Sequence, residues 1–268
     1  MTMTRLPRAA AVAALLLAAA CESAGTLPGE DGTAELRVFS AVYNASTARP
    51  GQRVDALVDG SPEQPGAAAL DRHTATAYAG LEAGVHRFGA RLAGDDRPAA
   101  QSALVTFDAR GRALAGWSYT LFLVGTVPAF GAPTVQPILV SEDPFAPSPG
   151  SARIRVVNAA PYAVGSAGTG AQLRVYLLPG SQPLPTSYAA LAPLFTIGYR
   201  QASPDVEVAP GTYRVAIVRT NGSLLASDTV QLAAGSRRTA VAVSTGPAAT
   251  PAPANHRVLR LTDRETPR

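Results

Sequence analysis

The chain has 268 residues, with 23 basic and 19 acidic side chains and a formal net charge of +4. This length allows one or two domains of ordinary size, and we expect two. All basic residues are arginines spread evenly along the chain, which argues against a nucleic-acid-binding surface. A single cysteine excludes a disulfide framework, so packing must hold the cores together.

The first 20 residues have the pattern of an export signal. Arg5 and Arg8 precede an apolar run over residues 9–20, which is too short to span a hydrocarbon core of about 30 Å. The run ends at Cys21, and residues 17–21 (Leu-Ala-Ala-Ala-Cys) resemble a bacterial lipobox, with Ala18 where a large aliphatic residue is usual. We expect lipidation of Cys21; an ordinary secretory signal that happens to precede a cysteine is the alternative.

Residues 21–33 are small, acidic or turn-forming, which predicts a flexible tether. The pattern then changes to alternation, which predicts a half-buried strand over residues 35–39, with Leu36 and Val38 on one face and Glu35 and Arg37 on the other. Helical periodicity is nowhere sustained, although residues 67–78 could hold a turn of helix. Further strands are predicted at Val54 to Gly60, Gly84 to Leu92, Ser102 to Phe107, Trp117 to Gly125 and Thr134 to Val140.

After a proline-rich linker at residues 144–150, the order of strands starts again with a period of about 120 residues. Residues 151–159 echo residues 34–41. Later correspondences relate 173–177 to 54–58, 210–217 to 83–88, 239–245 to 119–125, and 256–261 to 134–139. We therefore predict a tandem duplication with about seven short strands in each copy.

A hairpin is predicted at Asn221-Gly222, because both turn positions tolerate a positive φ. The predicted architecture is all-β, with two tandem immunoglobulin-like β-sandwich domains after a lipoprotein signal peptide. The first domain covers residues 34–143 and the second residues 151–263, followed by a tail at 264–268. Each copy has enough chain for its own core, so each half is expected to fold alone.

The strand patterns at Leu36 to Val38, Val54 to Gly60 and Tyr78 to Val85 resemble the modules of the domain-of-unknown-function family 4397. The resemblance covers essentially all of residues 34–262. The second copy departs from it, since Leu173 to Pro179 lies where the family has an aspartate-bearing strand. The resemblance implies a bacterial cell-surface module, often found in tandem, and assigns no activity.

Few side chains have the spacing of a chemical site. His73, His86 and His256 lie far apart without metal-ligand spacing, so we expect solvated or strand-face histidines. Asp55 and Asp59 would share one face of a strand and could bind a cation, although a turn or edge role for Asp59-Gly60 is the favoured alternative.

The remaining candidates also favour structural roles. Asp95-Asp96 and Glu142-Asp143 are predicted to be solvated loop pairs, because they lack the spaced ligands of a calcium loop. The glycine-rich residues 165–170 have no following helix and no lysine, which predicts a loop and not a phosphate site. Trp117, Tyr119 and Phe122 are predicted to be core residues and not a sugar-stacking platform.

These patterns favour a non-enzymatic envelope lipoprotein, held in the outer membrane of a bacterium by the lipid on Cys21, with no cofactor, metal or nucleic acid. Its two sandwiches would act as a binding or structural scaffold for an envelope protein or a polysaccharide. The alternative is an exported hydrolase or carbohydrate-active enzyme whose carboxylates converge only in the fold. Carboxylates meeting in a deep pocket would favour the enzyme, whereas shallow faces would favour the binding module.

Overall fold

The structure is a computed structural model that describes residues 32–44, 54–61, 70, 73–93, 109–127, 134–142, 144–161, 172–245 and 256–263. Every helix or strand assigned in these ranges is a strand, which confirms the all-β prediction. The predicted signal, most of the tether and the predicted strand at residues 102–107 lie outside the described residues.

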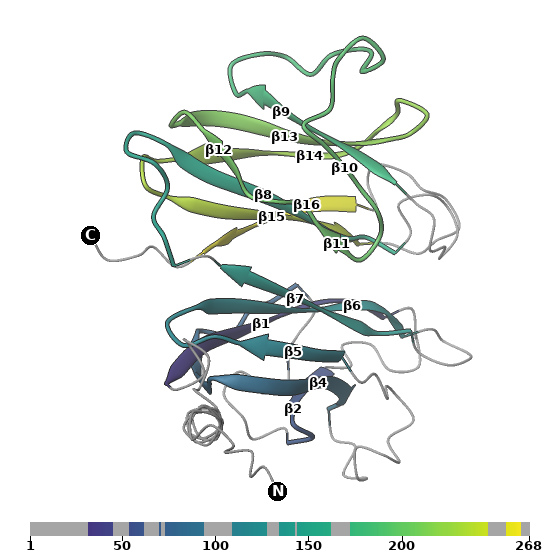
Figure 1. Cartoon of the computed structure of the whole chain (residues 1–268). Helices are drawn as coiled ribbons and strands as arrows, with labels where there is room; N and C mark the ends of the chain where they lie inside the picture. Colours follow the sequence, from purple (N-terminus) through teal and green to yellow (C-terminus); the bar gives the residue numbers. More distant parts are fainter. Residues whose placement is uncertain are drawn as a thin grey trace, which may run out of the picture.

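The first half of the chain forms a sandwich of two sheets (Figure 1). One sheet has the order β3-β1-β6-β7 and the other the order β2-β4-β5. β1 and β6 are parallel neighbours at the centre of their sheet, whereas an immunoglobulin sandwich is built from antiparallel sheets. The strands are β1 (Thr33–Asn44), β2 (Val54–Val58), β3 (Ala79–Glu82), β4 (Gly84–Leu92), β5 (Ala109–Ala113), β6 (Ser118–Val127) and β7 (Gln136–Glu142).

The second half forms a similar sandwich. One sheet has the order β11-β8-β15-β16, with β12 also paired to β8, and the other has the order β10-β9-β13-β14. Its strands are β8 (Ala152–Ala159), β9 (Leu173–Pro179), β10 (Phe195–Ile197), β11 (Gln201–Ala202), β12 (Val206–Val208), β13 (Gly211–Arg219), β14 (Leu224–Leu232), β15 (Arg237–Ser244) and β16 (His256–Thr262).

Stretches that correspond in the sequence occupy the same places in the two sheets. β8 lies parallel to β15 as β1 does to β6, and β16 pairs with β15 as β7 pairs with β6. The last strand of each set therefore pairs within its own half.

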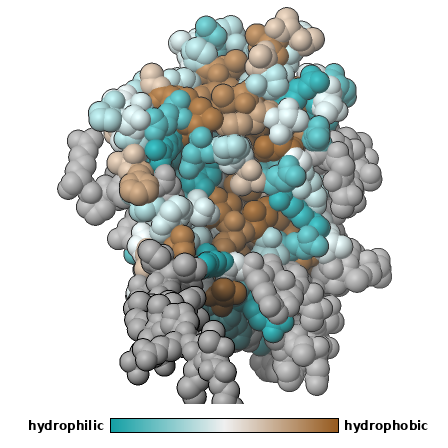
Figure 2. Space-filling view, in the orientation of Figure 1, coloured by the Kyte–Doolittle hydropathy of each residue, from teal (hydrophilic) through white to brown (hydrophobic). Residues whose placement is uncertain are grey.

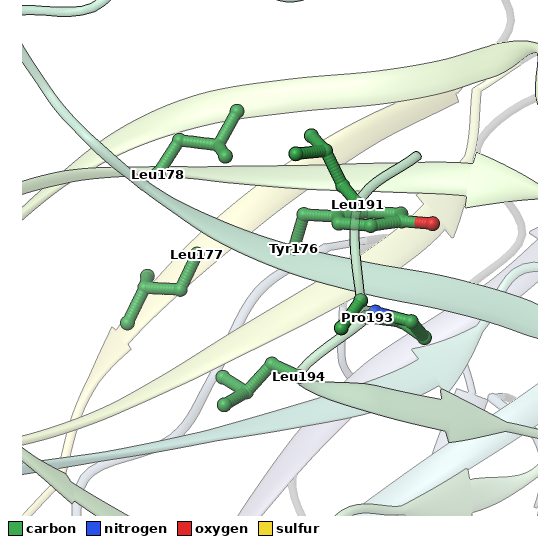
Figure 3. A pocket seen from close by; sticks show the side chains of 7 residues that line it. Tyr176, Leu177, Leu178, Leu191, Pro193 and Leu194 are labelled. Atoms are coloured by element: carbon green, nitrogen blue, oxygen red, sulfur yellow. The ribbon is translucent and has the colours of Figure 1, made fainter. Parts of the chain in front are cut away.

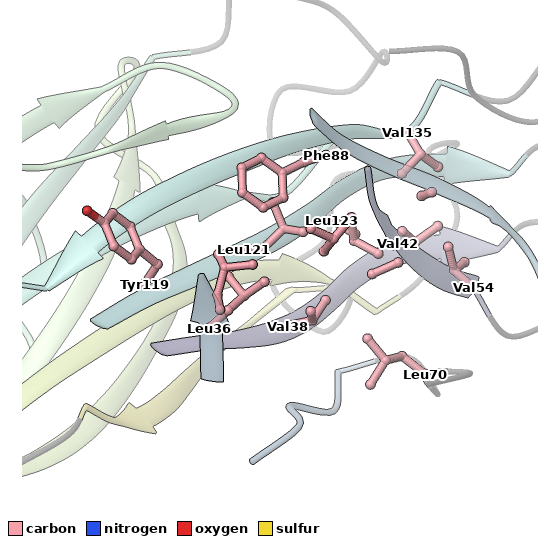
Figure 4. Close-up of a cluster of buried hydrophobic side chains, with 14 of the residues drawn as sticks. Leu36, Val38, Val42, Val54, Leu70, Phe88, Tyr119, Leu121, Leu123 and Val135 are labelled. Carbon is pink, nitrogen blue, oxygen red and sulfur yellow. The ribbon is translucent and has the colours of Figure 1, made fainter. Parts of the chain in front are cut away.

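Each sandwich has an apolar core between its two sheets. In the first half, Leu36, Val38 and Leu121 are fully buried in this core, together with Phe88 from the opposite sheet (Figure 4). In the second half, Ile154 and Ile217 occupy comparable positions between β8 and β13. The alternation of apolar side chains along the strands produces both cores.

The second face of β1 is also buried, and here the sequence prediction of a half-buried strand is wrong. Arg37, predicted on the polar face, is only 5% exposed, and Phe39 on the same face is 1% exposed. The cause is the second half of the chain, whose β8-β15-β16 sheet covers the β1-β6-β7 sheet. The four sheets therefore stack as layers, with the two halves in contact through their inner sheets (Figure 1).

The two turn predictions have different outcomes. The hairpin at Asn221-Gly222 is confirmed, but only Gly222 has a positive φ, of 85°, and the loop contains three residues between Arg219 and Ser223. The two-residue turn with both φ angles positive lies at Asp59-Gly60, with φ values of 53° and 80°. The favoured turn role of Asp59 is therefore confirmed.

The turn of helix considered for residues 67–78 does not form in the described part of that segment. Leu70 forms an antiparallel bridge with Val54, and Ala75 forms one with Phe39. These residues therefore run alongside the sheets as extended backbone.

We predict that Gly125→Ala lowers the free energy of unfolding by more than about 3 kcal/mol. Gly125 lies in β6 with a φ of 152°, and a Cβ atom there would lie 1.9 Å from the carbonyl oxygen of Thr134. Gly116→Ala is the control, because its φ is 77° but no atom lies within 4 Å of the added carbon, so it should cost only about 1 kcal/mol. Equal losses in urea denaturation would contradict the close approach of these backbones.

Candidate functional site

Several predicted sites lie outside the described residues. These are the lipidation site Cys21, the pair Asp95-Asp96, Asp143, and the glycine-rich residues 165–170. The expectations for them stay predictions.

The three histidines occupy separate parts of the fold. His73 lies in a loop and donates its main-chain amide to the carbonyl of Ser40, whereas His256 is the buried first residue of β16. The described residues contain no group of three side chains that could hold a metal ion.

His86 joins the turn after β2 to β4. Its Nδ1 lies 2.7 Å from Oδ2 of Asp59, and its Nε2 lies 2.7 Å from the carbonyl oxygen of Glu82. Partial burial acts to raise the pKa of Asp59, but hydrogen bonds from the amide of Arg87 and from His86 lower this pKa below its usual value. The carboxylate of Asp59 therefore stabilises a turn.

The side chain of Asp55 pairs with a residue of the neighbouring strand. It is paired with Arg91 on β4, and its Oδ2 lies 3.2 Å from Nε of that arginine. The carboxylates of Asp55 and Asp59 thus have different partners, and the described residues do not bring them together as a cation site.

The solvated-loop prediction for Glu142 is wrong. Glu142 is the last residue of β7 and is only 3% exposed. Its carboxylate accepts hydrogen bonds from the Tyr78 hydroxyl at 2.6 and 2.7 Å and from the Thr120 hydroxyl at 2.7 Å. It lies in the interface between the two halves, where the second half excludes the solvent expected for a loop.

Arg37 is the centre of this interface. Its guanidinium donates to Asp263 Oδ1 at 2.6 Å, to the carbonyl of Thr262 at 2.6 Å and to Glu142 Oε1 at 3.3 Å. It also lies over the ring of Tyr78, 4.7 Å from the ring centroid. A residue of the first strand is thereby bound to the last two residues that the structure describes.

Arg155 makes the equivalent contact from the second half. It occupies the position in β8 that Arg37 occupies in β1, opposite Thr239 as Arg37 is opposite Thr120. Its Nη1 donates at 2.7 Å to the carbonyl of Ser141, the residue before Glu142, just as Arg37 donates to the residue before Asp263. Each arginine therefore reaches across the interface to the end of the other half's last strand.

The threonines repeat the same relation. Thr120 donates to Glu142 at 2.7 Å, and Thr239 donates to Asp263 at 2.7 Å. The two halves thus present equivalent residues to each other, as the subunits of a twofold-symmetric dimer do.

Apolar side chains complete this interface. They come from equivalent positions on the paired inner strands, and the buried members are Phe39, Ala41, Phe122, Val124, Val140, Val157, Ala159, Val241, Val243 and Leu261. Phe39 and Phe122 are in ring contact, with centroids 5.6 Å apart. The core prediction for Tyr119 and Phe122 is confirmed, although Tyr119 faces the core of the first sandwich and Phe122 the interface.

We call four charged residues the buried ionic cluster: Arg37, Glu142, Arg155 and Asp263. Arg155 Nε lies 3.0 Å from Oδ1 of Asp205, an exposed residue next to the cluster, and the cluster itself contains two carboxylates and two guanidinium groups. Burial raises the pKa of Asp263, and the nearby Glu142 carboxylate raises it further against the charges of Arg37 and Arg155. Burial and the same carboxylate hold the pKa of Tyr78 well above its usual range.

A shallow apolar pocket lies elsewhere, at the edge of the outer sheet of the second half. It has a volume of about 290 Å³ and is lined by Tyr176, Leu177, Leu178, Leu191, Ala192, Pro193 and Leu194. Figure 3 shows Leu177 and Leu178 on one side and Leu191, Pro193 and Leu194 on the other. Tyr176 is the single titratable residue in this lining, so the pocket contains no acid, base or metal ligand.

Residues 34–165 match the family model described as Domain of unknown function (DUF4397). This match spans β1 to β8, and therefore the whole first sandwich. The first half of the chain is a DUF4397 module. The predicted resemblance is confirmed for this part of the chain, and the DUF4397 module supplies Arg37, Glu142 and one side of the interface. No curated protein matches the chain.

The solved structures that resemble the chain are distant. A leucine-rich repeat protein from Bacteroides thetaiotaomicron is 11% identical over 78% of this chain, which spans 26% of that protein, with a TM-score of 0.18. Candidate cell adhesion proteins from Bacteroides eggerthii and Bacteroides fragilis are 9% and 10% identical over 88% of this chain, covering 96% and 99% of those chains, with TM-scores of 0.24 and 0.22. Scores this low carry no argument about function.

We predict that Asp263→Ala lowers the free energy of unfolding by about 3 kcal/mol or more, because it leaves the buried guanidinium of Arg37 without its closest carboxylate. The matched control is Asp228→Ala in the same half. Asp228 pairs with Arg260, whose side chain is 58% exposed, so this loss should stay within about 1 kcal/mol. Urea denaturation followed by far-UV circular dichroism measures both, and equal losses would show that the buried pair contributes little.

A second prediction concerns pH and compares wild type with Asp263→Asn. Because the folded-state pKa of Asp263 is raised, the contribution of its carboxyl to stability is complete below the ordinary pKa of about 3.9 and is lost as pH rises through the folded value. Wild type should therefore lose stability relative to this variant as pH rises above 4. Asp59→Asn should show the opposite slope, since the lowered pKa of Asp59 gives a contribution that is lost as pH falls. Slopes of the same sign would contradict the assignment.

Proposed function

We propose that this chain is a non-enzymatic envelope lipoprotein whose two sandwiches form one rigid scaffold, anchored to the outer membrane through Cys21, for binding an envelope protein or polysaccharide. The observation that carries the proposal is the packing of the halves through equivalent buried faces. Such an interface fixes their relative orientation, as a scaffold that displays a surface at a set distance from a membrane requires.

The positions of the carboxylates support the scaffold over the enzyme. Two of them, Glu142 and Asp263, do converge in the buried ionic cluster, but both pair with Arg37 and lie between two sheets. A general acid or base must lie within hydrogen-bond reach of a substrate, and Glu142 and Asp263 are 3% and 2% exposed. Glu142 instead accepts hydrogen bonds from Tyr78 and Thr120, and Asp263 pairs with Arg37 across the interface.

The mode of anchoring rests on the start of the chain. In the part of the chain that the structure describes, no helix is long and apolar enough to cross a bilayer. A diacylglycerol with an amide-linked acyl chain on Cys21 would supply the two hydrophobic signals that stable attachment needs. The segment up to Gly32 would then separate the lipid from the first strand.

We predict that Cys21→Ser abolishes lipid attachment and moves the protein from the membrane fraction to the soluble fraction, because serine has no thiol to carry the diacylglycerol. Mass spectrometry of the mature N-terminus and fractionation with a high-salt wash measure this. Ser23→Ala, two residues further along the predicted tether, is the matched control and should stay in the membrane. A Cys21→Ser protein that still sediments after the wash would refute the lipid anchor.

A further inference from the structure

The strand β9 has an open edge beside the apolar pocket. β13 pairs with β9 along its whole length, whereas the three-residue β10 pairs only with Leu173 to Val175 on the other side. The amide of Leu194 donates to the carbonyl of Val175 at 2.7 Å, so the main-chain groups of Val175 face β10. The main-chain N–H and C=O groups of successive residues point to opposite sides of a strand, so those of Leu177 face the same edge as those of Val175. No described strand pairs with Leu177 at this edge.

The edge is short and has a definite end. Pro179, two residues beyond Leu177, has no N–H, and its carbonyl accepts a hydrogen bond from Gln182 at 3.0 Å. Edge strands of native sheets are commonly blunted by proline in this way. The open edge is thus the N–H and C=O of Leu177, and an added strand could form two main-chain hydrogen bonds there.

Apolar side chains surround this edge. Leu191 and Leu194 are 40% and 37% exposed and line the pocket together with Leu177 and Leu178. Figure 2 shows a hydrophobic area on the front of the second half, bordered by hydrophilic residues. An extended chain that bonds to Leu177 would place an apolar side chain in this pocket, which lies where the next strand would run.

The charge around the pocket selects among such chains. Arg214 on β13 is the cross-strand neighbour of the pocket residue Leu178, and Arg174 lies on β9 two residues before the pocket residue Tyr176. Both arginines are on the same outer face of the sheet as these two residues. Neither arginine has an ion-pair partner among the described residues. The pocket lining has no carboxylate of its own. The site therefore favours a partner segment with acidic residues beside an apolar one.

We propose that the edge of β9 at Leu177, with its pocket, binds an extended apolar peptide segment flanked by acidic residues, which adds to the β10-β9-β13-β14 sheet as a short strand. This inference rests on the proposed scaffold role and names the partner chemistry of its binding surface. Main-chain hydrogen bonds supply the extended conformation, and the pocket supplies selectivity for a large aliphatic side chain.

The test uses the full chain purified in detergent and three fluorescein-labelled heptapeptides of one sequence, with a central leucine, alternating valine and threonine, and an aspartate at each end. The first is unmodified, the second is N-methylated at one residue whose N–H would face β9, and the third is N-methylated at the neighbouring residue, whose N–H would face away. The two N-methylated peptides are made for each of the two possible registers of the peptide on β9. In one register the methyl group then replaces the hydrogen of the N–H that bonds to Leu177. Fluorescence anisotropy should show binding of the first and third peptides and a loss of at least about tenfold for the second.

Protein variants locate the site. Leu191→Asp should weaken binding by at least about tenfold, because it places a charge in the pocket and repels the acidic flanks. Val85→Asp is the matched control, since Val85 is 67% exposed on the other half, and it should leave binding unchanged. Equal binding of all three peptides, equal loss in both variants, or no binding at millimolar peptide would overturn the proposal. These results are independent of the lipid, so failure here would leave the anchoring of Cys21 standing.

Discussion

The structure depends on the burial of Arg37 between the two halves of the chain. A guanidinium taken out of water is costly unless carboxylates and carbonyls satisfy it, and here the partners come from both halves. Removing one side of the interface would expose Phe39 and Phe122 and would also leave Arg37 without Asp263. Such a contact gives the arrangement of the halves more specificity than an apolar face alone.

The equivalence of the two faces explains how this interface is built. Arg37, Thr120 and Glu142 match Arg155, Thr239 and Asp263 in position and in hydrogen bonding. A face that is complementary to its own counterpart needs a single pattern of residues, used twice. The two faces differ in detail, because Arg37 binds Asp263 while Arg155 is paired with Asp205. Burial, followed by the nearby Glu142 carboxylate, raises the pKa of Asp263.

The strands could be predicted from the sequence because their apolar side chains alternate, and corresponding stretches do take corresponding places. The sequence pattern does not predict the interface, because Glu35 and Arg37 indicate a solvated face. A signal was nevertheless present: Phe39 and Ala41 lie on the same face as Arg37, and Val157 and Ala159 lie on the same face as Arg155. An arginine followed by apolar residues at every second position, in both copies, predicts a covered face. Strand pairing, by contrast, depends on contacts between residues far apart in the chain, which is why the parallel β1-β6 pair and the burial of Glu142 had no local signal.

The central claim is that the two halves form one cooperative unit, although each has enough strands for a core of its own. Trp117 is the single tryptophan of the chain and packs against the core of the first sandwich, so its fluorescence reports that half. Far-UV circular dichroism reports the strands of both halves. Urea denaturation followed by both signals should give one transition with the same midpoint. A Trp117 transition clearly separated from a second one seen by circular dichroism would show that the halves unfold independently and would contradict the account.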